Sequence, residues 1–399
     1  MADLPALRSW LAEVTAHLPH LSKPQAGGLA LWSFGMVVAQ SCGLTSVAAV
    51  LAKLLGKKEN TVRQQLRESY QAAHDKKGAG GKGVQRQAVD VSTCFAPLVK
   101  WILSGWPATE QRLALAMDAT TLAARFTVLA ISIVYRGCAI PVAWAVLPAT
   151  TPGSWQPHWR ALFEHLRASV PSDWTVIVLA DRGLYAKWLY HAIQHAGWHP
   201  FLRINAGGQY RLATSRTFQS LTNLVPEAGQ AWCAPVVCFK SNPLPCTLLA
   251  RRDERYTDPW LIITDLAPAQ ADVCWYALRA WIESGFKDTK RGGWHWHHTQ
   301  ITDPARATRH WLAIALATFW VVSVGGEADA TLPVSSLADL PETHIARRRS
   351  TKRTRPRLLS CFRRGWIHLL CDLLAGQPVP IGRFYPEPWP TSSPTRAAT

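Results

Sequence analysis

The sequence predicts a mixed α/β fold in which helices flank one sheet, preceded by a helical N-terminal domain. Three observations lead to this prediction. Residues 5–72 carry apolar residues at helical spacing. From residue 111 onward, short apolar runs typical of strands alternate with helical patterns. Between 207 and 266 strands and turns dominate, which indicates a β-rich insertion within the α/β fold.

The N-terminal region has its strongest apolar periodicity at residues 29–55, with a turn expected at Gly43. Another helix is expected to open at Asn60, because asparagine commonly caps helix N-termini. Residues 73–90 are rich in Gly and Lys and predict a flexible basic linker. We therefore expect residues 1–90 to form a helical domain that ends in this linker.

The middle of the chain predicts a sheet covered by helices. Residues 112–117, 126–135 and 138–147 are apolar runs with strand character, which suggests consecutive hairpins. Residues 174–180 form a continuous apolar run, as expected for a strand buried on both faces. Helical patterns stand before and after this run, and a further strand is expected at 200–204. This order is consistent with a ribonuclease-H-like sheet.

The predicted domain boundaries follow these changes of pattern. We expect the first part of the ribonuclease-H-like core at 105–206, the β-rich insertion at 207–266 and the second part of the core at 267–326. Residues 327–399 have weaker periodicity, a basic block at 347–357 and a Pro-rich end. That last region carries no motif that predicts a role.

The charge balance bears on the partner. Lys and Arg outnumber Asp and Glu by 43 to 26, which gives a net charge of +17 and a pI of about 9.8. Such an excess favours a polyanionic partner, either nucleic acid or an anionic membrane surface. The two most apolar stretches, 29–55 and 311–326, are interrupted by polar residues or shorter than the ~20 residues of a spanning helix. We expect buried helices there, no membrane association, and DNA contact by residues 1–90, with an ordinary solvated bundle as the alternative.

The location expected for the protein is the cytoplasm, in association with the nucleoid. The N-terminus lacks a basic segment followed by an apolar run, so no secretory signal is predicted. The nine cysteines are odd in number and include no CxxC pair, which does not suit a zinc site or a disulfide framework. Free thiols in a reducing compartment are the interpretation that fits.

Two aspartates follow strands that are expected to be neighbours. Asp118 comes directly after the strand at 112–117, and Asp181 after the buried strand at 174–180. Carboxylates are rarely buried unless they are paired or bind a metal, and open α/β sheets place their sites at strand ends. Each aspartate alone could equally be a turn or capping residue. Together they suggest a site.

A strong helical pattern at 267–290 carries four polar residues at fixed spacing. Tyr276, Arg279, Glu283 and Lys290 fall at i, i+3, i+7 and i+14, which is one stripe of an α-helix. A hydrophobic packing face would not select these groups. A salt-bridged surface stripe, with Arg279 and Glu283 as an i, i+4 pair, is the alternative.

This spacing, Tyr276-x2-Arg279-x3-Glu283-x6-Lys290, resembles the YREK motif of DDE transposases of the insertion-sequence-four-like group. Four positions at fixed spacing form a fairly specific pattern. The similarity extends over roughly residues 20–325, including the helical N-terminus and the β-rich insertion that precedes Glu283.

The two aspartates fit the same family. Asp118 in MDATTL and Asp181 in LADRGLY resemble its first and second acidic motifs. One departure is Leu184, where the family has an aromatic residue after Asp-Arg-Gly, and Tyr185 is the candidate substitute. The departure leaves the acidic triad intact and concerns local packing.

The resemblance implies an enzyme, a DNA transposase of an insertion sequence. It would bind double-stranded DNA at terminal inverted repeats, cleave there and transfer strands to a target, as a homodimer holding the DNA ends. Asp118, Asp181 and Glu283 would be the catalytic residues and hold two divalent metal ions. Carboxylate and water ligands suit Mg²⁺ or Mn²⁺. A metal-dependent endonuclease without strand transfer and a non-catalytic DNA-binding protein derived from a transposase are the competing functions.

The DNA-binding residues also follow from the resemblance. It implies that Tyr276, Arg279 and Lys290 grip phosphates of the transposon end, since Arg binds phosphate bidentately and Lys supplies a point charge. Lys287 and Arg291 lie nearby in the sequence and are expected to add non-specific affinity.

Other chemistry-bearing residues carry weaker arguments. Asp253, Glu254 and Asp265 are alternative third acids, but none lies on a comparable stripe. Arg182 could contact DNA or form an ion pair within the fold. Residues 294–298, Trp-His-Trp-His-His, invite a metal interpretation, yet no acid stands nearby at ligand spacing. A packed or DNA-facing aromatic loop is the favoured interpretation there.

Overall fold

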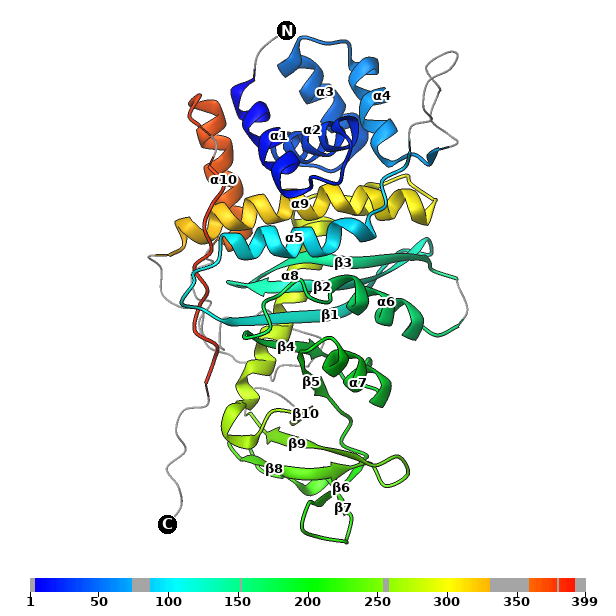
Figure 1. Cartoon of the computed structure of the whole chain (residues 1–399), viewed down its shortest axis with the longest axis vertical. Helices are drawn as coiled ribbons and strands as arrows, with labels where there is room; N and C mark the ends of the chain where they lie inside the picture. The colour runs from blue at the N-terminus through cyan, green and yellow to red at the C-terminus, as the bar shows by residue number, and fades with distance from the viewer. Residues whose placement is uncertain are drawn as a thin grey trace, which may run out of the picture.

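The computed structural model describes residues 4–73, 87–150, 153–253, 258–330, 359–378 and 380–391. Most of the predicted basic linker, the basic block at 347–357 and Glu254 lie outside these residues. Figure 1 shows the layers in order: an N-terminal helical region, a layer of long helices, and a sheet that continues to the opposite end.

The described part of the N-terminal region holds four helices, of which α2 and α4 pack against the long helix α9 (Pro304–Ala328). In α4, Val62 and Leu66 are fully buried while the remaining face is polar. This helix begins at Glu59, so Asn60 lies in its first turn and is not the expected cap. The four helices are α1 (Pro5–His17), α2 (Lys23–Ala39), α3 (Leu44–Leu55) and α4 (Glu59–Tyr70).

The first five strands form the predicted ribonuclease-H-like sheet, in the order β3-β2-β1-β4-β5. β2 runs antiparallel to both of its neighbours, β1 and β3, and β4 and β5 run parallel to β1. All ten positions of β2 are buried, because helices cover both faces of this part of the sheet. The strands are β1 (Arg112–Leu122), β2 (Phe126–Tyr135), β3 (Cys138–Pro148), β4 (Thr175–Ala180) and β5 (His199–Arg203). The helices beside them are α5 (Ser92–Ser104), α6 (Gln156–Leu166) and α7 (Lys187–His195).

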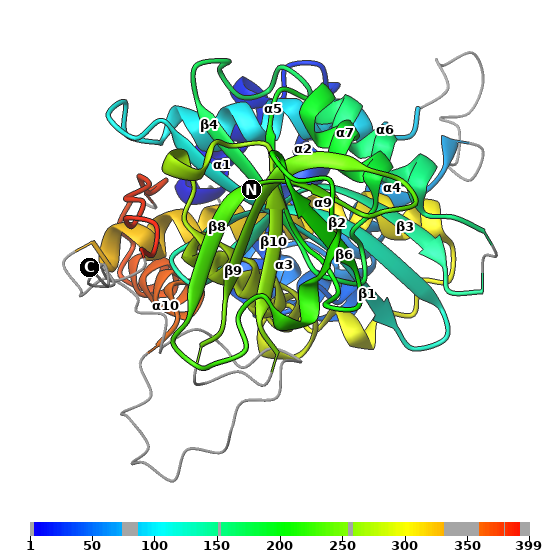
Figure 2. The ribbon, with the colours of Figure 1, turned by 90° about the horizontal axis from the view of Figure 1, so that it is seen from below.

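The region predicted as a β-rich insertion continues the same sheet. β10 lies antiparallel beside β5, and the order then runs β10-β9-β8-β6-β7, so that the sheet has ten strands within the described residues. Figure 2 shows these strands fanning out from the core. They are β6 (Gln209–Leu212), β7 (Gln219–Ser220), β8 (Ala231–Cys238), β9 (Leu244–Arg251) and β10 (Trp260–Thr264).

Helix α9 is the central helix of the molecule. By length and composition it could cross a membrane, yet 89% of its most apolar window is buried inside the protein. α2 and α3 meet the same criterion only as a pair bent by 94°. Helix α10 (Cys361–Leu374) crosses α9 at very close range, since a Cβ on Gly325 would lie 2.0 Å from the carbonyl oxygen of Cys361. Glycine is required at that crossing.

The C-terminal segment 380–391 returns along the core (Figure 1). Its backbone N–H groups at Phe384 and Tyr385 donate to the carbonyl oxygen of Gly105 and to the hydroxyl of Tyr135, at 3.0 and 2.8 Å. The indole N–H of Trp320 on α9 donates to the carbonyl oxygen of Pro380 at 2.9 Å. These bonds attach the segment to both the sheet and the central helix.

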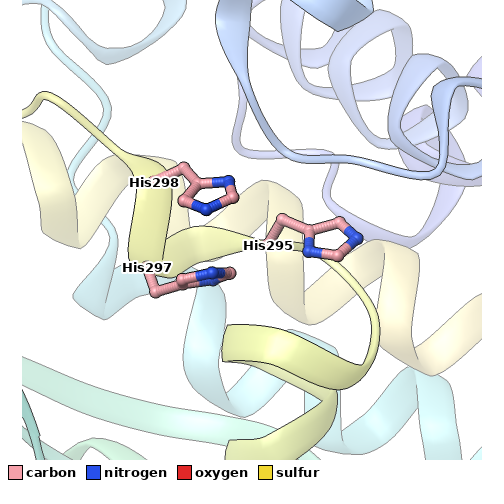
Figure 3. Close-up of side chains that lie close together, drawn as sticks. All are labelled: His295, His297 and His298. Atoms are coloured by element: carbon pink, nitrogen blue, oxygen red, sulfur yellow. The ribbon is translucent and has the colours of Figure 1, made fainter.

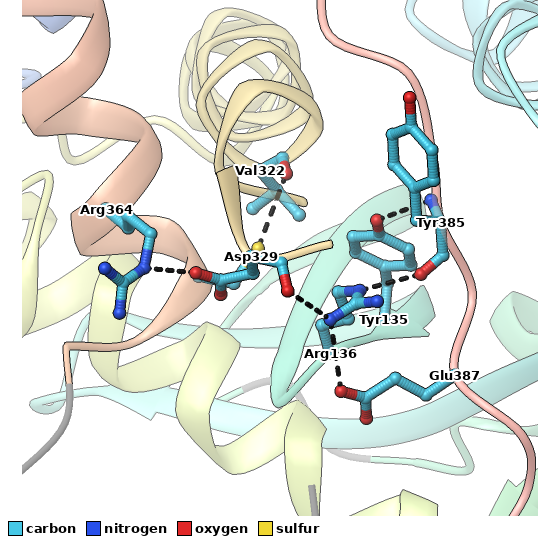
Figure 4. A network of polar contacts seen from close by, with 8 residues as sticks. Tyr135, Arg136, Val322, Asp329, Arg364, Tyr385 and Glu387 are labelled. Atoms are coloured by element: carbon cyan, nitrogen blue, oxygen red, sulfur yellow. Dashed lines mark hydrogen bonds and ion pairs between the residues drawn. The ribbon is translucent and has the colours of Figure 1, made fainter. Parts of the chain in front are cut away.

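An arginine network reinforces this attachment (Figure 4). Arg136 lies in the left-handed region (φ 44°) of the tight β2–β3 turn. Its guanidinium donates to the carbonyl oxygens of Tyr385 (2.7 Å) and Asp329 (3.1 Å) and pairs with Glu387 at 3.3 Å. The Asp329 carboxylate pairs with Arg364 on α10. The network therefore joins the hairpin, α9, α10 and the C-terminal segment.

Candidate active site

The pairing of β1 with β4 brings Asp118 and Asp181 together. The last paired residues are Ala116 and Leu179, and each aspartate stands two positions further on, so both carboxylates face the same side of the sheet. Asp118 was expected just past the end of its strand. It lies instead inside β1, opposite Ala130 of β2, because β1 extends four residues beyond it while β4 stops at Ala180. The shorter neighbour leaves Asp118 accessible from one side.

Glu283 comes from a composite helical segment that packs against β1, β2 and β3. The expected continuous α-helix over 267–290 is wrong. A 3₁₀ helix at Val273–Ala280 begins where the Asp272 carboxylate accepts from the N–H of Cys274, and α8 (Trp281–Lys287) follows. A π-helical turn at Asp288–Gly292 ends the segment.

The change of helix type alters the predicted stripe. Tyr276 is only 3% exposed, its ring meets Trp260 edge-on at 5.4 Å, and burial raises the pKa of its hydroxyl to about 12. A stripe drawn at 3.6 residues per turn does not hold across a 3₁₀ helix, which has three residues per turn. Tyr276 is buried and does not line the cavity that holds the acids, and its expected contact with a DNA phosphate stays a prediction.

Arg279 is the centre of the site. Its guanidinium lies 2.5 Å from Asp118, 3.3 Å from Glu283 and 3.6 Å from Asp181, measured between the nearest nitrogen and oxygen atoms. The side chain is 7% exposed. Three acids from β1, the end of β4 and α8 thus converge on one cation. They lie in a cavity of about 520 Å³.

Burial and mutual repulsion shape the acid chemistry. Burial raises the pKa of Asp118 to about 6, with Arg279 opposing the shift and Glu283 and Asp181 adding to it. The other oxygen of Asp118 accepts from the N–H of Ala119 at 2.8 Å, and Asp181 accepts from the N–H of Gly183 at 2.7 Å. These bonds orient both carboxylates toward the cavity.

Three cationic side chains line the same cavity. Lys290 donates to the hydroxyl of Thr120 at 2.6 Å, and burial lowers the pKa of its ammonium. Lys287 and Arg291 are exposed at the rim. Lys287, Lys290 and Arg291, which the sequence predicted as DNA contacts, therefore lie beside the acids.

Thr120 and Phe286 also line the cavity but were not singled out from the sequence. A period of two along β1 would have identified Thr120, because it shares the face of Asp118. Phe286 stands one turn after Glu283 on α8.

The alternative third acids lie elsewhere. Asp265 pairs with His199 at 3.0 Å and Asp253 lies 3.7 Å from Arg251, and neither lines the cavity. Arg182 forms an exposed ion pair with Asp258 at 2.9 Å. An ion pair was one of the two roles expected for it.

The donor set fits a hard divalent cation, since Asp118, Asp181 and Glu283 offer only carboxylate oxygens. Arg279 stands between them as a positive charge, which shows that the cavity stabilises a cation among these acids. Arg279 also keeps the acids apart. Among the described residues, the only three ligand atoms that lie within 4.8 Å of one another belong to histidines.

Comparison with known proteins places the chain in a family. No curated protein matches the chain. Seven chains of solved structures match, among them a piggyBac transposase in a synaptic complex with hairpin DNA. That chain is 9% identical, with a TM-score of 0.33 over 93% of this chain and 78% of the other. The family model described as "Transposase DDE domain" matches residues 110–320, more than half of the chain and the whole span of the three acids. The chain belongs to the family of transposases with a DDE domain.

Proposed function

We propose that this transposase cleaves and joins DNA at a site formed by Asp118, Asp181 and Glu283. The observation that carries the proposal is the convergence of these three acids on Arg279 inside a cavity rimmed by lysine and arginine. Carboxylates that converge in a buried site repel one another, and a divalent cation bound between them would relieve that repulsion.

The acids are the proposed ligands of two Mg²⁺ or Mn²⁺ ions. When bound, two such ions activate a water or a 3′-hydroxyl and stabilise the leaving oxygen of an in-line displacement. Asp118 is central, because it is the least exposed of the three and lies closest to Arg279. We infer that the guanidinium of Arg279, which lies among the acids, would be available to bind a DNA phosphate beside them.

Lys287, Lys290 and Arg291 are the proposed phosphate contacts. They line the same cavity as the acids. When the scissile phosphate reaches the acids, the adjacent phosphates of the DNA strand would therefore lie beside these cations. We further propose that the substrate is the terminal inverted repeats of an insertion sequence of the insertion-sequence-four-like group, held by a homodimer. Arg279, Glu283 and Lys290 of the YREK motif line one cavity in support of this assignment, and Tyr276 has the structural role of packing on Trp260.

The test is a cleavage and joining assay with the untagged full chain, Mg²⁺ and a duplex that carries the inverted repeats flanking its gene. We expect cut ends and products joined to a target plasmid. Asp181→Asn should reduce both by about a thousandfold or more. Asp258→Asn is the matched control, since it removes a nearby exposed carboxylate that does not line the cavity. Full activity of Asp181→Asn would refute the proposed site, and cutting without joining would indicate an endonuclease.

A further inference from the structure

A second cluster of metal-ligating side chains lies apart from the acids, in the loop after the π-helical turn. His295, His297 and His298 each present a ring nitrogen, and these three nitrogens lie within 4.8 Å of one another (Figure 3). The rings of His297 and His298 are 3.8 Å apart between centroids. Nitrogens that share a zinc ion at about 2.0–2.1 Å each are at most ~4.2 Å apart, so only a small closure is needed.

Buried tryptophans hold the loop in place. Trp294 and Trp296 alternate with the histidines and are fully buried. The indole N–H of Trp294 donates to Thr318 on α9 at 2.8 Å, and its carbonyl oxygen accepts from the N–H of Cys42 at 2.7 Å. The two tryptophans are therefore packed, as the interpretation of a packed aromatic loop predicted. Anchoring them directs the histidines outward as a group.

Local geometry prepares the imidazoles as ligands. The Nδ1–H of His297 donates to the carbonyl oxygen of Lys290 at 2.7 Å, which leaves Nε2 available. A second hydrogen bond of this kind fixes the tautomer and ring orientation of most metal-binding histidines. His295 adopts the left-handed conformation (φ 59°, ψ 31°), which is uncommon for a residue other than glycine and occurs at ligand-holding positions. This turn brings the ring of His295 beside that of His298, 6.0 Å away between centroids, and a rotation of one ring about its side-chain bonds would aim both nitrogens at one ion.

Space for a fourth ligand lies next to the cluster. His295 and His298 line a cavity of about 480 Å³ between the loop and the N-terminal helices, together with Ser41, Thr45 and Arg67. A water molecule or small anion there would complete four-coordination. Three imidazoles suit a divalent transition metal rather than Mg²⁺, and tetrahedral coordination with one open position suits zinc.

We propose that His295, His297 and His298 bind one Zn²⁺ ion at a site distinct from the acidic cavity. The absence of a nearby acid, which spoke against a metal in the sequence, does not matter when three imidazoles converge. The bound ion would fix the loop between the π-helical turn and α9, which contacts the N-terminal region at Cys42. Through His297 and the carbonyl of Lys290 it would also hold the backbone of a residue whose ammonium reaches Thr120 in the acidic cavity.

The test uses the untagged full chain, stripped of metal, in the Asp181→Asn background so that the acids compete less for the ion. Zn²⁺ is titrated by calorimetry in millimolar Mg²⁺. We expect one Zn²⁺ per chain, and each of His295→Asn, His297→Gln and His298→Asn should weaken binding by about 10–100-fold. His191→Asn, an exposed histidine on α7, is the control and should bind as the parent does. Binding by the triple histidine variant as tight as by the parent would overturn the proposal.

A second measurement separates a built site from loose surface binding. Hydrogen exchange of the backbone at 288–300 should slow with Zn²⁺ in the parent and not in the triple variant. Unchanged exchange in the parent at saturating Zn²⁺ would also refute the proposed role, even if the ion binds. Neither measurement depends on DNA cleavage, so failure here leaves the proposed transposase activity untouched.

Discussion

Two groups of arginine and acidic side chains in this molecule have opposite character. In the first, Arg136 and Arg364 meet Asp329 and Glu387 at the junction of hairpin, helices and C-terminal segment (Figure 4). The arginines equal the acids in number, and backbone carbonyls accept further N–H groups of Arg136. Burial raises the pKa of Asp329, but Arg364 and Arg136 both oppose that shift. Such a network holds structure.

The second group has one arginine in contact with three acids. Arg279 is well buried, yet the cavity around Asp118, Asp181 and Glu283 is open to solvent. Burial again raises the pKa of Asp118, and here two neighbouring acids reinforce the shift. The contrast is between a closed network that joins several elements and a cavity, open to solvent, in which three acids converge as they would around a ligand.

The largest effect that would test this contrast is expected from Arg136→Ala. The change leaves Glu387 buried without its guanidinium and frees the carbonyl of Tyr385. Breaking a buried ion pair costs about 3–5 kcal/mol. Urea denaturation should show this decrease in the free energy of unfolding both with and without Mg²⁺. Arg279→Ala is the matched variant, and Mg²⁺ should largely restore its free energy of unfolding. Equal Mg²⁺ responses in the two variants would break the comparison.

A smaller effect is expected from Asp118→Asn in metal-free protein. Burial raises the pKa of Asp118 to about 6 in the folded chain, above its ordinary value of 3.8. The folded state therefore binds more protons than the unfolded state between these values, and stability falls as pH rises from about 4 to 6. The amide cannot ionise, so the variant should be more stable by about 1–3 kcal/mol above pH 7. That gain should vanish near pH 3, and a gain independent of pH would contradict the assignment.

The smallest effect concerns the rim of the open cavity. For DNA binding, the logarithm of the affinity falls linearly with the logarithm of the salt concentration. Lys287→Gln and Arg291→Gln should each make this slope shallower by about one. Tyr276→Phe should leave the slope unchanged, because its ring is buried against Trp260. Fluorescence anisotropy across a salt series measures this. Lys100→Gln, exposed on α5, is the control.

Patterns local in the sequence were predicted well. The strands of the core are continuous apolar runs, and the ribonuclease-H-like order follows from them. Asp118 and Asp181 were noticed because they follow such runs, and Glu283 because of its spacing from Arg279 and Lys290. These residues indeed lie in one cavity.

Features that depend on distant contacts were not predicted. The 3₁₀ helix at Val273–Ala280 lies against β1, β4, β9 and β10, which come from distant parts of the chain, and α8 packs so closely on β3 that a Cβ on Gly285 would lie 2.8 Å from that of Ala139. The buried position of Tyr276 depends on Trp260 in a strand that the sequence assigned to an insertion. The position of the C-terminal segment could not be predicted, because its partners, such as Tyr135, are remote in the chain.

The sheet order has a consequence for protein synthesis. Asp118 leaves the ribosome long before Glu283, and β10 can take its place beside β5 only after the intervening strands have been made. Contacts between such distant parts of a chain form late and slowly. A nascent or prematurely terminated polypeptide that lacks Glu283 therefore has two acids but no complete triad. Translation itself therefore delays the moment at which the three acids can converge on Arg279.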